Sequence, residues 1–280
     1  MTPTLLPTAT ETPPPAWVTI MLTPETGDTS GTPDPNEQGE GTVDATSSRT
    51  RFPTSTPPPP SAILTIQKPG PYSKVVSPIE LRVIVHPGDD KLVYLDLIGE
   101  DGRVINSQNY NFSASTNYWI YTVQKIPFEI QSFAESARLV LYTRDQYNRI
   151  IYQVSVDLIL LQFGDDSINI PVVVDEPYII RKPWEGGTVR GGVMEVDGLA
   201  RLVNDQPLII ELIDEEGNLV GSAEVEIAQP SALQPYVPFI AEVPYSVSQW
   251  TRVRFVARQE SATRIPGTVW LTSVLIYLEP

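Results

Sequence analysis

The chain offers few residues that could carry out acid–base or nucleophilic chemistry. Its single imidazole, His86, lies in the run His86-Pro87-Gly88-Asp89-Asp90, which is typical of a turn, and there is no cysteine. Nucleophilic catalysis requires a serine, threonine or cysteine beside a base, and a lone histidine in a turn does not indicate such a pair. No glycine-rich phosphate loop of the Walker or Rossmann type is present either. We therefore predict a protein that is not an enzyme and holds no cofactor.

Paired carboxylates are the other candidates for chemistry. They occur at Asp89-Asp90, Glu100-Asp101, Asp165-Asp166 and Asp214-Glu215-Glu216. Two carboxylates can hydrolyse a glycosidic bond, but these pairs lie at expected turns, where charge stays solvated. Calcium is the alternative, because it binds about six to eight oxygens and stiffens junctions between extracellular domains. We name Asp165 and Asp166, at an expected junction, as its candidate ligands.

Exposed aromatic residues could stack on a sugar ring or anchor a protein contact. Trp184 and Tyr72 follow Pro183 and Pro69 in similar turns, and Gly186-Gly187 after Trp184 cannot cover the indole well. Both are therefore candidate binding residues. Packing within the fold is the alternative role for Trp184.

Two arginines form a local basic strip in an acidic chain. Arg252 and Arg254 alternate with Val253 and Phe255, so both guanidinium groups leave the same face of a strand. They are candidate contacts for an acidic partner. Pairing with a cross-strand carboxylate such as Glu211 is the alternative.

An internal repeat must position all of these residues. Two stretches about 115 residues apart match: Ile66-Gln67-Lys68-Pro69 corresponds to Ile180-Arg181-Lys182-Pro183, and Glu100-Asp101-Gly102 corresponds to Glu215-Glu216-Gly217. A unit of this length is a whole domain, since solenoid repeats run to roughly 20–50 residues. The sequence predicts two tandem domains and a linker, at residues 61–163, 178–280 and 164–177.

Short apolar or alternating runs, separated by turn residues, predict β-strands throughout both copies. In the first copy we expect strands at 62–67, 79–85, 92–98, 103–110, 118–124, 137–143 and 149–161. In the second we expect them at 178–181, 194–201, 208–213, 219–227, 237–242, 252–258 and 268–278. Only Gln131–Ser136 and Ser248–Thr251 resemble helical turns. Strands with one apolar face bury that face when two sheets pack against each other. The predicted fold is therefore all-β, with two tandem immunoglobulin-like β-sandwiches.

The first 60 residues differ in composition from the rest. They hold 13 of the 28 prolines, mostly beside threonines, as in Thr54-Ser55-Thr56-Pro57-Pro58-Pro59-Pro60. Proline removes backbone donors and the few large apolar residues cannot offset the entropy of ordering, so residues 1–60 are predicted to be a disordered stalk. Such stalks carry O-linked sugars on extracellular proteins. We also expect the natural export signal to precede Met1.

Charge and hydropathy exclude several classes of partner. The formal charge is −15 and the sequence pI about 4.4, whereas nucleic-acid binders neutralise phosphates with lysine and arginine. Nucleic acid and anionic membrane surfaces are therefore not expected partners. No run of about 18 apolar residues exists, so no transmembrane segment is expected.

Three short elements of the second copy form a signature. They are Lys182-Pro183, Gly187-Thr188-Val189 and Val196-Asp197-Gly198-Leu199-Ala200. They resemble the start of the immunoglobulin-like domain of bacterial spore-germination and related envelope lipoproteins, which has a Pro-containing strand end, a Gly-x-Val turn, Ser-Pro and Val-x-Gly-x-Ala. The resemblance covers nearly all of residues 62–280. It implies an extracytoplasmic accessory module and supplies no ligand.

Each copy keeps only part of that signature. The first copy has Pro69 and Ser77-Pro78, but Val83-Ile84-Val85 stands where Val-x-Gly-x-Ala is expected. The second copy has Gly191-Gly192 in place of Ser-Pro.

These observations together predict a non-enzymatic, extracytoplasmic bacterial protein, on the cell surface or secreted. Its stalk would hold two immunoglobulin-like domains for adhesion or envelope interaction, with an envelope polysaccharide or a surface protein as partner. One alternative is a carbohydrate-binding accessory region of a larger secreted enzyme whose catalytic part lies upstream. The other is a passive spacer without a ligand.

Overall fold

The computed structural model describes residues 59–113, 115, 118–171, 175–231 and 234–280. The expected stalk lies outside these residues, apart from Pro59 and Pro60. Every regular element in the described part of the chain is a β-strand. Accordingly, the described residues include no helix that could cross a membrane.

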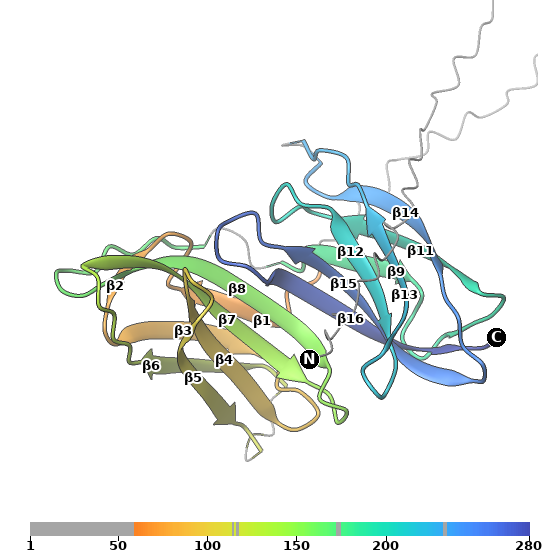
Figure 1. Cartoon of the computed structure of the whole chain (residues 1–280), viewed down its shortest axis with the longest axis horizontal. Helices are drawn as coiled ribbons and strands as arrows, with labels where there is room; N and C mark the ends of the chain where they lie inside the picture. The colour runs from red at the N-terminus through yellow and green to blue at the C-terminus, as the bar shows by residue number, and fades with distance from the viewer. Residues whose placement is uncertain (1–58, 114, 116–117, 172–174, 232–233) are drawn as a thin grey trace, which may run out of the picture. The chain divides into compact units, whose positions relative to one another are not determined.

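The first lobe is a sandwich of two sheets (Figure 1). Its strands are β1 (Leu64–Lys68), β2 (Lys74–Val76), β3 (Ile79–Val85), β4 (Leu92–Gly99), β5 (Val104–Asn111), β6 (Ile120–Ile126), β7 (Ala134–Arg144) and β8 (Ile150–Leu161). One layer has the order β1-β3-β6 and the other β8-β7-β4-β5. All these pairs are antiparallel, whereas β2 pairs with the end of β8 in parallel.

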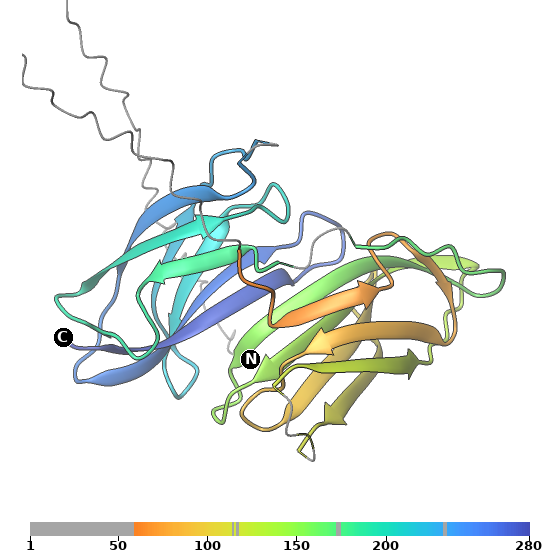
Figure 2. The same ribbon diagram turned by 180° about the vertical axis from the view of Figure 1, so that it is seen from behind.

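The second lobe repeats this plan, as the view from behind also shows (Figure 2). Its strands are β9 (Tyr178–Lys182), β10 (Thr188–Val189), β11 (Val193–Ala200), β12 (Leu208–Ile213), β13 (Leu219–Val225), β14 (Val237–Pro244), β15 (Thr251–Glu260) and β16 (Thr268–Leu278). One layer has the order β14-β11-β9 and the other β16-β15-β12-β13. The short strand β10 pairs in parallel with the end of β16, as β2 does with β8.

The all-β, immunoglobulin-like fold predicted from the sequence is confirmed, and each expected strand is present. The helical turns expected at Gln131–Ser136 and Ser248–Thr251 are wrong: β7 already begins at Ala134, and residues 248 and 249 form a bend before β15. The polar residues at these two corners are spaced as in a helix. A stretch of four to six residues is too short to distinguish a helical turn from a bend. Strands β2 and β10 were not predicted, because two or three residues carry no alternation.

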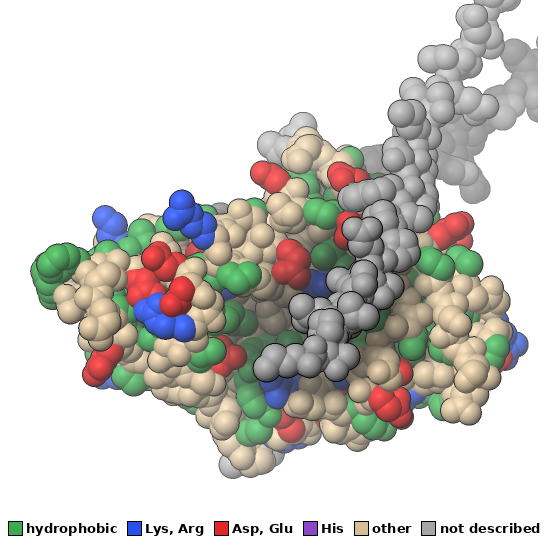
Figure 3. Space-filling view, viewed as in Figure 1, with side chains coloured by type: hydrophobic (Ala, Val, Ile, Leu, Met, Phe, Trp, Pro, Cys, Tyr) green, Lys and Arg blue, Asp and Glu red, His purple; other side chains and the backbone are tan. Residues whose placement is uncertain are grey.

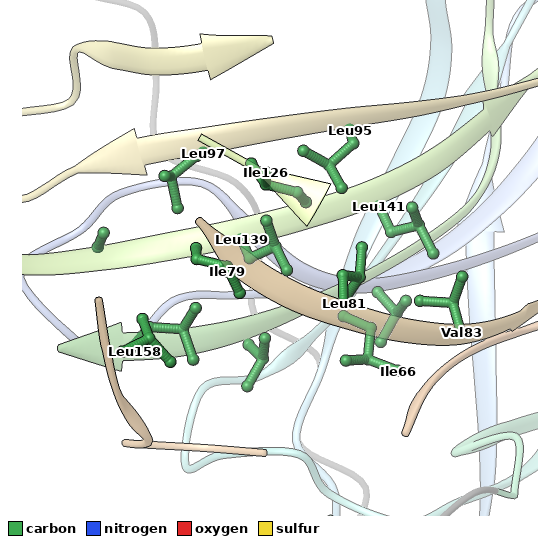
Figure 4. Packing of buried hydrophobic residues seen from close by; sticks show 14 of the residues in the cluster. Ile66, Ile79, Leu81, Val83, Leu95, Leu97, Ile126, Leu139, Leu141 and Leu158 are labelled. Carbon is green, nitrogen blue, oxygen red and sulfur yellow. The ribbon is translucent and has the colours of Figure 1, made fainter. Parts of the chain in front are cut away.

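Each lobe buries its own apolar core between its sheets, because alternate side chains of a strand point to opposite faces. In β4 the even and odd positions separate cleanly, with Val93, Leu95 and Leu97 at most 1% exposed. Figure 4 shows side chains of both layers of the first lobe directed toward one another, including Ile66, Ile79, Leu81, Val83, Leu95, Leu97, Ile126, Leu139, Leu141 and Leu158. A second cluster fills the second lobe, and Trp270 packs against both clusters.

The matching stretches Glu100-Asp101-Gly102 and Glu215-Glu216-Gly217 form the turns of the β4–β5 and β12–β13 hairpins. Gly102 and Gly217 have φ of 82° and 86°, the left-handed region that costs other residues energy. Their N–H groups donate to the carbonyls of Gly99 and Asp214 across the turn.

The segment expected as a linker is hydrogen-bonded to the first lobe over its described part. Ser167 and Lys74 exchange two backbone hydrogen bonds of 2.9 Å, and the Asn169 N–H donates to the Ser73 hydroxyl at 2.9 Å. Gly70 has no space for a side chain, because a Cβ there would lie 2.7 Å from the Asn169 carbonyl oxygen. This segment is therefore packed on the lobe that precedes it.

The described residues belong to one compact unit, because the last strands of the two lobes pair with each other. Val154 of β8 lies opposite Trp270 of β16 in antiparallel register. The neighbouring pair, Gln153 opposite Leu271, joins equivalent positions of the repeat. Ile159 and Tyr277 hold matching places opposite β2 and β10, and both pairs of residues are 118 apart in the sequence. A surface that pairs with its own equivalent is the geometry of an isologous homodimer. Here the two copies belong to one chain.

We call the contact between the two lobes along the β8–β16 pairing the seam. Two buried arginines beside it also occupy equivalent positions of the repeat. Arg138 of β7 is 1% exposed and donates to the Ser261 hydroxyl of the other lobe at 2.7 Å. Its equivalent Arg254, 116 residues later, donates to the Asp145 carboxylate of the first lobe at 3.0 Å. The hairpin that follows is two residues longer in the second lobe, which accounts for the offset of 118 in the last strands. Asp145 and Ser261 are equivalents as well. Each lobe therefore inserts the same arginine toward the same hairpin of the other lobe.

The carboxylates that compensate these cations are not placed symmetrically. Arg138 pairs with Asp157 of its own lobe at 2.7 Å, whereas the equivalent of Asp157, opposite Arg254 in the sheet, is Leu275. Arg254 therefore depends on Asp145 across the seam, and Asp145 also binds Arg149 at 2.8 Å.

Asp145 is the carboxylate on which the seam depends most. Burial opposes its ionisation, but the Arg149 backbone N–H and the charges of Arg254 and Arg149 outweigh burial and lower the pKa of Asp145. Its side chain is 2% exposed, so the ion pairs are shielded from solvent.

We predict that Asp145→Asn lowers the free energy of unfolding by about 3 kcal/mol, because it leaves two buried guanidinium groups without a counter-charge. Urea denaturation measures this difference. The matched control is Asp101→Asn. The side chain of Asp101 is 56% exposed in an ion pair with Arg103, so this variant should lose much less stability. Equal losses in the two variants would contradict a special role for the seam.

Candidate functional site

Trp184 is the predicted binding residue that the structure places in a groove. It lies in the turn between β9 and β10, and 66% of it is exposed to solvent. The groove has a volume of about 360 Å³ and is lined by Trp184 together with Pro183, Val189, Lys182, Arg190 and Glu195. Concave sites with an aromatic wall and a few polar groups are typical of ligand pockets.

Backbone hydrogen bonds hold this turn against β16. The Gly186 N–H donates to the Leu275 carbonyl at 2.7 Å, and the Tyr277 N–H donates to the Gly187 carbonyl at 2.8 Å. A Cβ on Gly187 would lie 3.1 Å from Nε1 of Trp184 and 3.0 Å from its carbonyl oxygen. Glycine at this position therefore lets the indole lie close to the backbone of the turn and leaves its other side open to solvent.

The rim of the groove is polar. Nζ of Lys182 lies 3.3 Å from a carboxylate oxygen of Glu195, and Nε of Arg190 lies 2.7 Å from a carboxylate oxygen of Glu279. The side chains of Lys182 and Arg190 are 56% and 73% exposed. The indole can thus stack on an apolar face of a ligand while the rim offers hydrogen bonds to its hydroxyls.

Tyr72 is also exposed, at 61%, but it does not line this groove. It has a φ of 59° in the turn after β1, and its N–H donates to the Asp157 carbonyl at 2.7 Å. The structure therefore places the two predicted aromatic residues in separate lobes, where they do not share a site.

The two arginines of the predicted basic strip have different surroundings. Arg254 is buried and donates to Asp145 and to the Ser273 hydroxyl. Arg252 is partly exposed, and its Nη1 makes only long contacts, 3.5 Å to Glu215 and 3.4 Å to the Tyr147 hydroxyl.

The strip therefore does not face solvent as a unit, because Arg254 turns toward the other lobe. Glu211, the cross-strand partner considered for the strip, instead pairs with Arg258 at 2.8 Å.

The calcium candidates Asp165 and Asp166 lie after β8. Oδ1 of Asp166 accepts a hydrogen bond of 2.8 Å from the Val76 N–H, and Asp165 is exposed. Among the described residues no group of three or more acidic or histidine side chains is placed to hold a metal. A calcium site here would rest on these two carboxylates and on backbone oxygens.

A second, polar pocket lies where the two lobes meet, and the sequence did not predict it. Its volume is about 340 Å³, and it is lined by His86 and residues of both lobes. Burial and then the charge of Lys91 lower the pKa of His86, so the imidazole is neutral at neutral pH. The pocket arises from the pairing of β8 with β16, for which the sequence carries no local signal.

Charged side chains of both signs are interspersed on the face of the molecule in Figure 3. No continuous basic area covers that face, which agrees with the acidic composition. A polyanion would therefore find no extended complementary surface there.

Comparisons with known proteins give no family. No protein-family profile matches the chain, and no curated protein matches it. Solved structures give weak likenesses. Dimeric latent PorU from Porphyromonas gingivalis is 16% identical over 80% of this chain, which spans 20% of PorU, with a TM-score of 0.27.

Two further structures are likenesses of the same weak kind. The Ig1-2 module of the Drosophila receptor protein tyrosine phosphatase DLAR is 14% identical, with 78% of this chain and 100% of that chain covered and a TM-score of 0.21. CBD12 from CALX1.2 is 12% identical, with 70% and 80% covered and a TM-score of 0.18. Likenesses at this level carry no argument about ligands or activity.

Glu176 is a buried carboxyl group beside the seam. It is 8% exposed, and its Oε1 accepts a hydrogen bond of 3.0 Å from the indole N–H of Trp270. Burial raises the pKa of Glu176 to about 7, although the bond from Trp270, the Tyr178 N–H and the charge of Arg201 act in the opposite direction. The carboxyl group therefore changes its protonation state near neutral pH.

We predict that Glu176 makes stability fall as pH rises. Below about pH 4.5 the group is protonated in both states and contributes no slope. Between about pH 4.5 and 7 only the folded state keeps the proton, so the free energy of unfolding falls by roughly 3 kcal/mol in all. Above about pH 7 both states are ionised and the slope disappears.

Glu176→Gln imitates the protonated form and should remove this loss, while exposed Glu224→Gln should not. Urea denaturation between about pH 4.5 and 8 gives the difference between each variant and the natural chain. A difference for Glu176→Gln that stays constant across this range would contradict the shifted pKa.

Proposed function

We propose that the chain is a non-enzymatic, extracytoplasmic recognition module of a bacterial cell envelope, and that it contacts an envelope polysaccharide through the Trp184 groove. The observation that carries the proposal is an indole that is 66% exposed at the wall of a concave, polar-rimmed site. The sequence resemblance of both copies to immunoglobulin-like domains of envelope lipoproteins supports the location. The composition of residues 1–60 supports a stalk that separates the domains from a surface.

A flat aromatic ring suits a sugar because pyranose rings present an apolar C–H face between their hydroxyls. Large aromatic side chains supply much of the binding energy at recognition sites when they are held rigidly. The backbone bonds of the Gly186-Gly187 turn to β16 fix the position of Trp184 before any ligand arrives. Little conformational entropy is then lost on binding, which favours affinity.

The seam between the lobes supports the same function. Its buried ion pairs and the β8–β16 pairing join the two sandwiches through hydrogen-bonded contacts instead of a free linker. A module built in this way presents its groove on a rigid support. The accessory-region alternative would use the same groove and differs in the protein to which the chain is attached.

We predict that Trp184→Ala weakens binding to purified cell-wall polysaccharide at least tenfold, about 1.4 kcal/mol, without changing the melting temperature appreciably. Affinity electrophoresis or calorimetry with peptidoglycan and wall polysaccharides measures the effect. Trp250→Ala is the matched control, because Trp250 is 56% exposed but is stacked on Tyr277 and does not line the groove.

Two outcomes would argue against this proposal. If the natural chain binds none of these polymers, the passive-spacer alternative is favoured. If Trp184→Ala unfolds the second lobe, the indole is a packing residue and its exposure has another cause.

A further inference from the structure

The pocket between the lobes has the character of a built binding site. Its first-lobe wall contains His86, Asp89, Tyr118, Thr143 and Tyr152, and its second-lobe wall contains Glu185, Arg252 and Arg254. The groups are polar or aromatic, and they come from several separate segments of the chain. Sites of this size, about 340 Å³, hold small ligands.

The quasi-twofold relation between the lobes shows that this pocket is not a general result of the seam. The equivalent of Thr143 is Gln259, which is 116 residues later. Gln259 fills its position with hydrogen bonds to the Tyr178 hydroxyl at 2.7 Å and the Val203 N–H at 2.9 Å. Thr143 is shorter, and its buried hydroxyl has no partner among the described residues. At this position the first lobe therefore has an open space lined by polar groups, whereas in the second lobe the side chain of Gln259 fills the space.

Of the two arginines that line this pocket, Arg252 has the weaker hydrogen bonds from its guanidinium group. Its two hydrogen bonds, at 3.4 and 3.5 Å, are at the limit of such bonds and use only Nη1, and Nε has no hydrogen-bond partner in the described part of the chain. The guanidinium group also lies over the ring of Tyr147, 5.5 Å from its centroid. Arg254 beside it is held by bonds of 3.0 and 3.1 Å to Asp145 and Ser273. A guanidinium group has five donors, and its preferred ligand is a carboxylate bound by two of them.

Other residues lining the pocket supply a ring surface and acceptors. The rings of His86 and Tyr118 are in contact, with centroids 3.7 Å apart and planes tilted by 32°, and Tyr118 is 59% exposed. Glu185 uses one carboxylate oxygen to accept the Leu275 N–H, and the side chain of Asp89 is exposed at the wall. Carboxylate oxygens accept hydrogen bonds from hydroxyl groups.

The hydroxyl of Tyr152 completes the wall. Burial and then the charges of Glu176 and Glu185 raise the pKa of Tyr152 to about 12. The phenol therefore stays protonated and can donate a hydrogen bond.

We propose that this pocket binds one sugar residue that carries a carboxylate, as in a uronic acid. The carboxylate binds the guanidinium group of Arg252, the sugar ring lies against Tyr118, and Asp89 and Glu185 accept hydrogen bonds from its hydroxyls. The site is separate from the Trp184 groove and does not depend on it. A single carboxylate meets the local cation, so the overall charge of −15 does not oppose binding as it would oppose a polyanion.

The test is calorimetry or ligand-observed NMR with the full chain, sodium D-glucuronate as probe and D-glucose as its neutral counterpart. We expect glucuronate to bind and glucose to bind at least tenfold more weakly. Arg252→Gln should weaken glucuronate binding at least tenfold. Arg190→Gln, an exposed arginine of the other groove, and Trp184→Ala should leave it unchanged.

A second variant guards against a folding defect, because Arg252 also lies at the seam. Tyr118→Leu removes an exposed ring and should weaken glucuronate binding while the melting temperature stays the same. The proposal is overturned if glucuronate does not bind saturably, if glucose binds equally well, or if Arg190→Gln weakens binding as much as Arg252→Gln does.

Discussion

Two buried arginines donate hydrogen bonds across the seam, and the rest of this structure depends on these bonds. A guanidinium group removed from water needs a carboxylate and further acceptors. Arg254 finds its carboxylate only in Asp145 of the other lobe, and Arg138 completes its hydrogen bonds with Ser261 of the other lobe. These demands are met only when β8 and β16 lie side by side. The seam thus turns two sandwiches with separate cores into one support for both candidate sites.

Duplication explains why the seam is possible, and divergence explains what it does. When a domain that can pair with itself is duplicated, the chain contains both halves of an isologous interface. Equivalent positions then need not stay equivalent. Leu275 stands at the position of Asp157, and Gln259 stands at the position of Thr143. The first difference makes one arginine depend on the other lobe. The difference between Thr143 and Gln259 leaves a polar pocket beside the first lobe, whereas the equivalent place in the second lobe is filled.

The sequence predicted the elements of the fold well and the contacts between the lobes not at all. Period-two alternation, as in Val93, Leu95 and Leu97, reports which face of a strand is buried, so the strands and the sandwich followed from local pattern. Arg254 has the spacing of a solvent-facing residue, and nothing nearby in sequence indicates that Asp145, more than a hundred residues earlier, will neutralise it. The exposure of Trp184 was predicted from the glycines beside it, because that effect is local. The pocket was missed because its walls come from distant segments.

Strand β16 is the common support of the two sites. Leu275 of β16 binds the turn on both sides: its carbonyl accepts from Gly186, and its N–H donates to the carboxylate of Glu185. Trp184 lines the groove and the next residue, Glu185, lines the pocket between the lobes. The same strand pairs with β8 at Trp270. A change that loosens the seam therefore reaches both sites through β16. A change of the exposed indole affects only the groove, because its side chain supports no backbone contact of the strand.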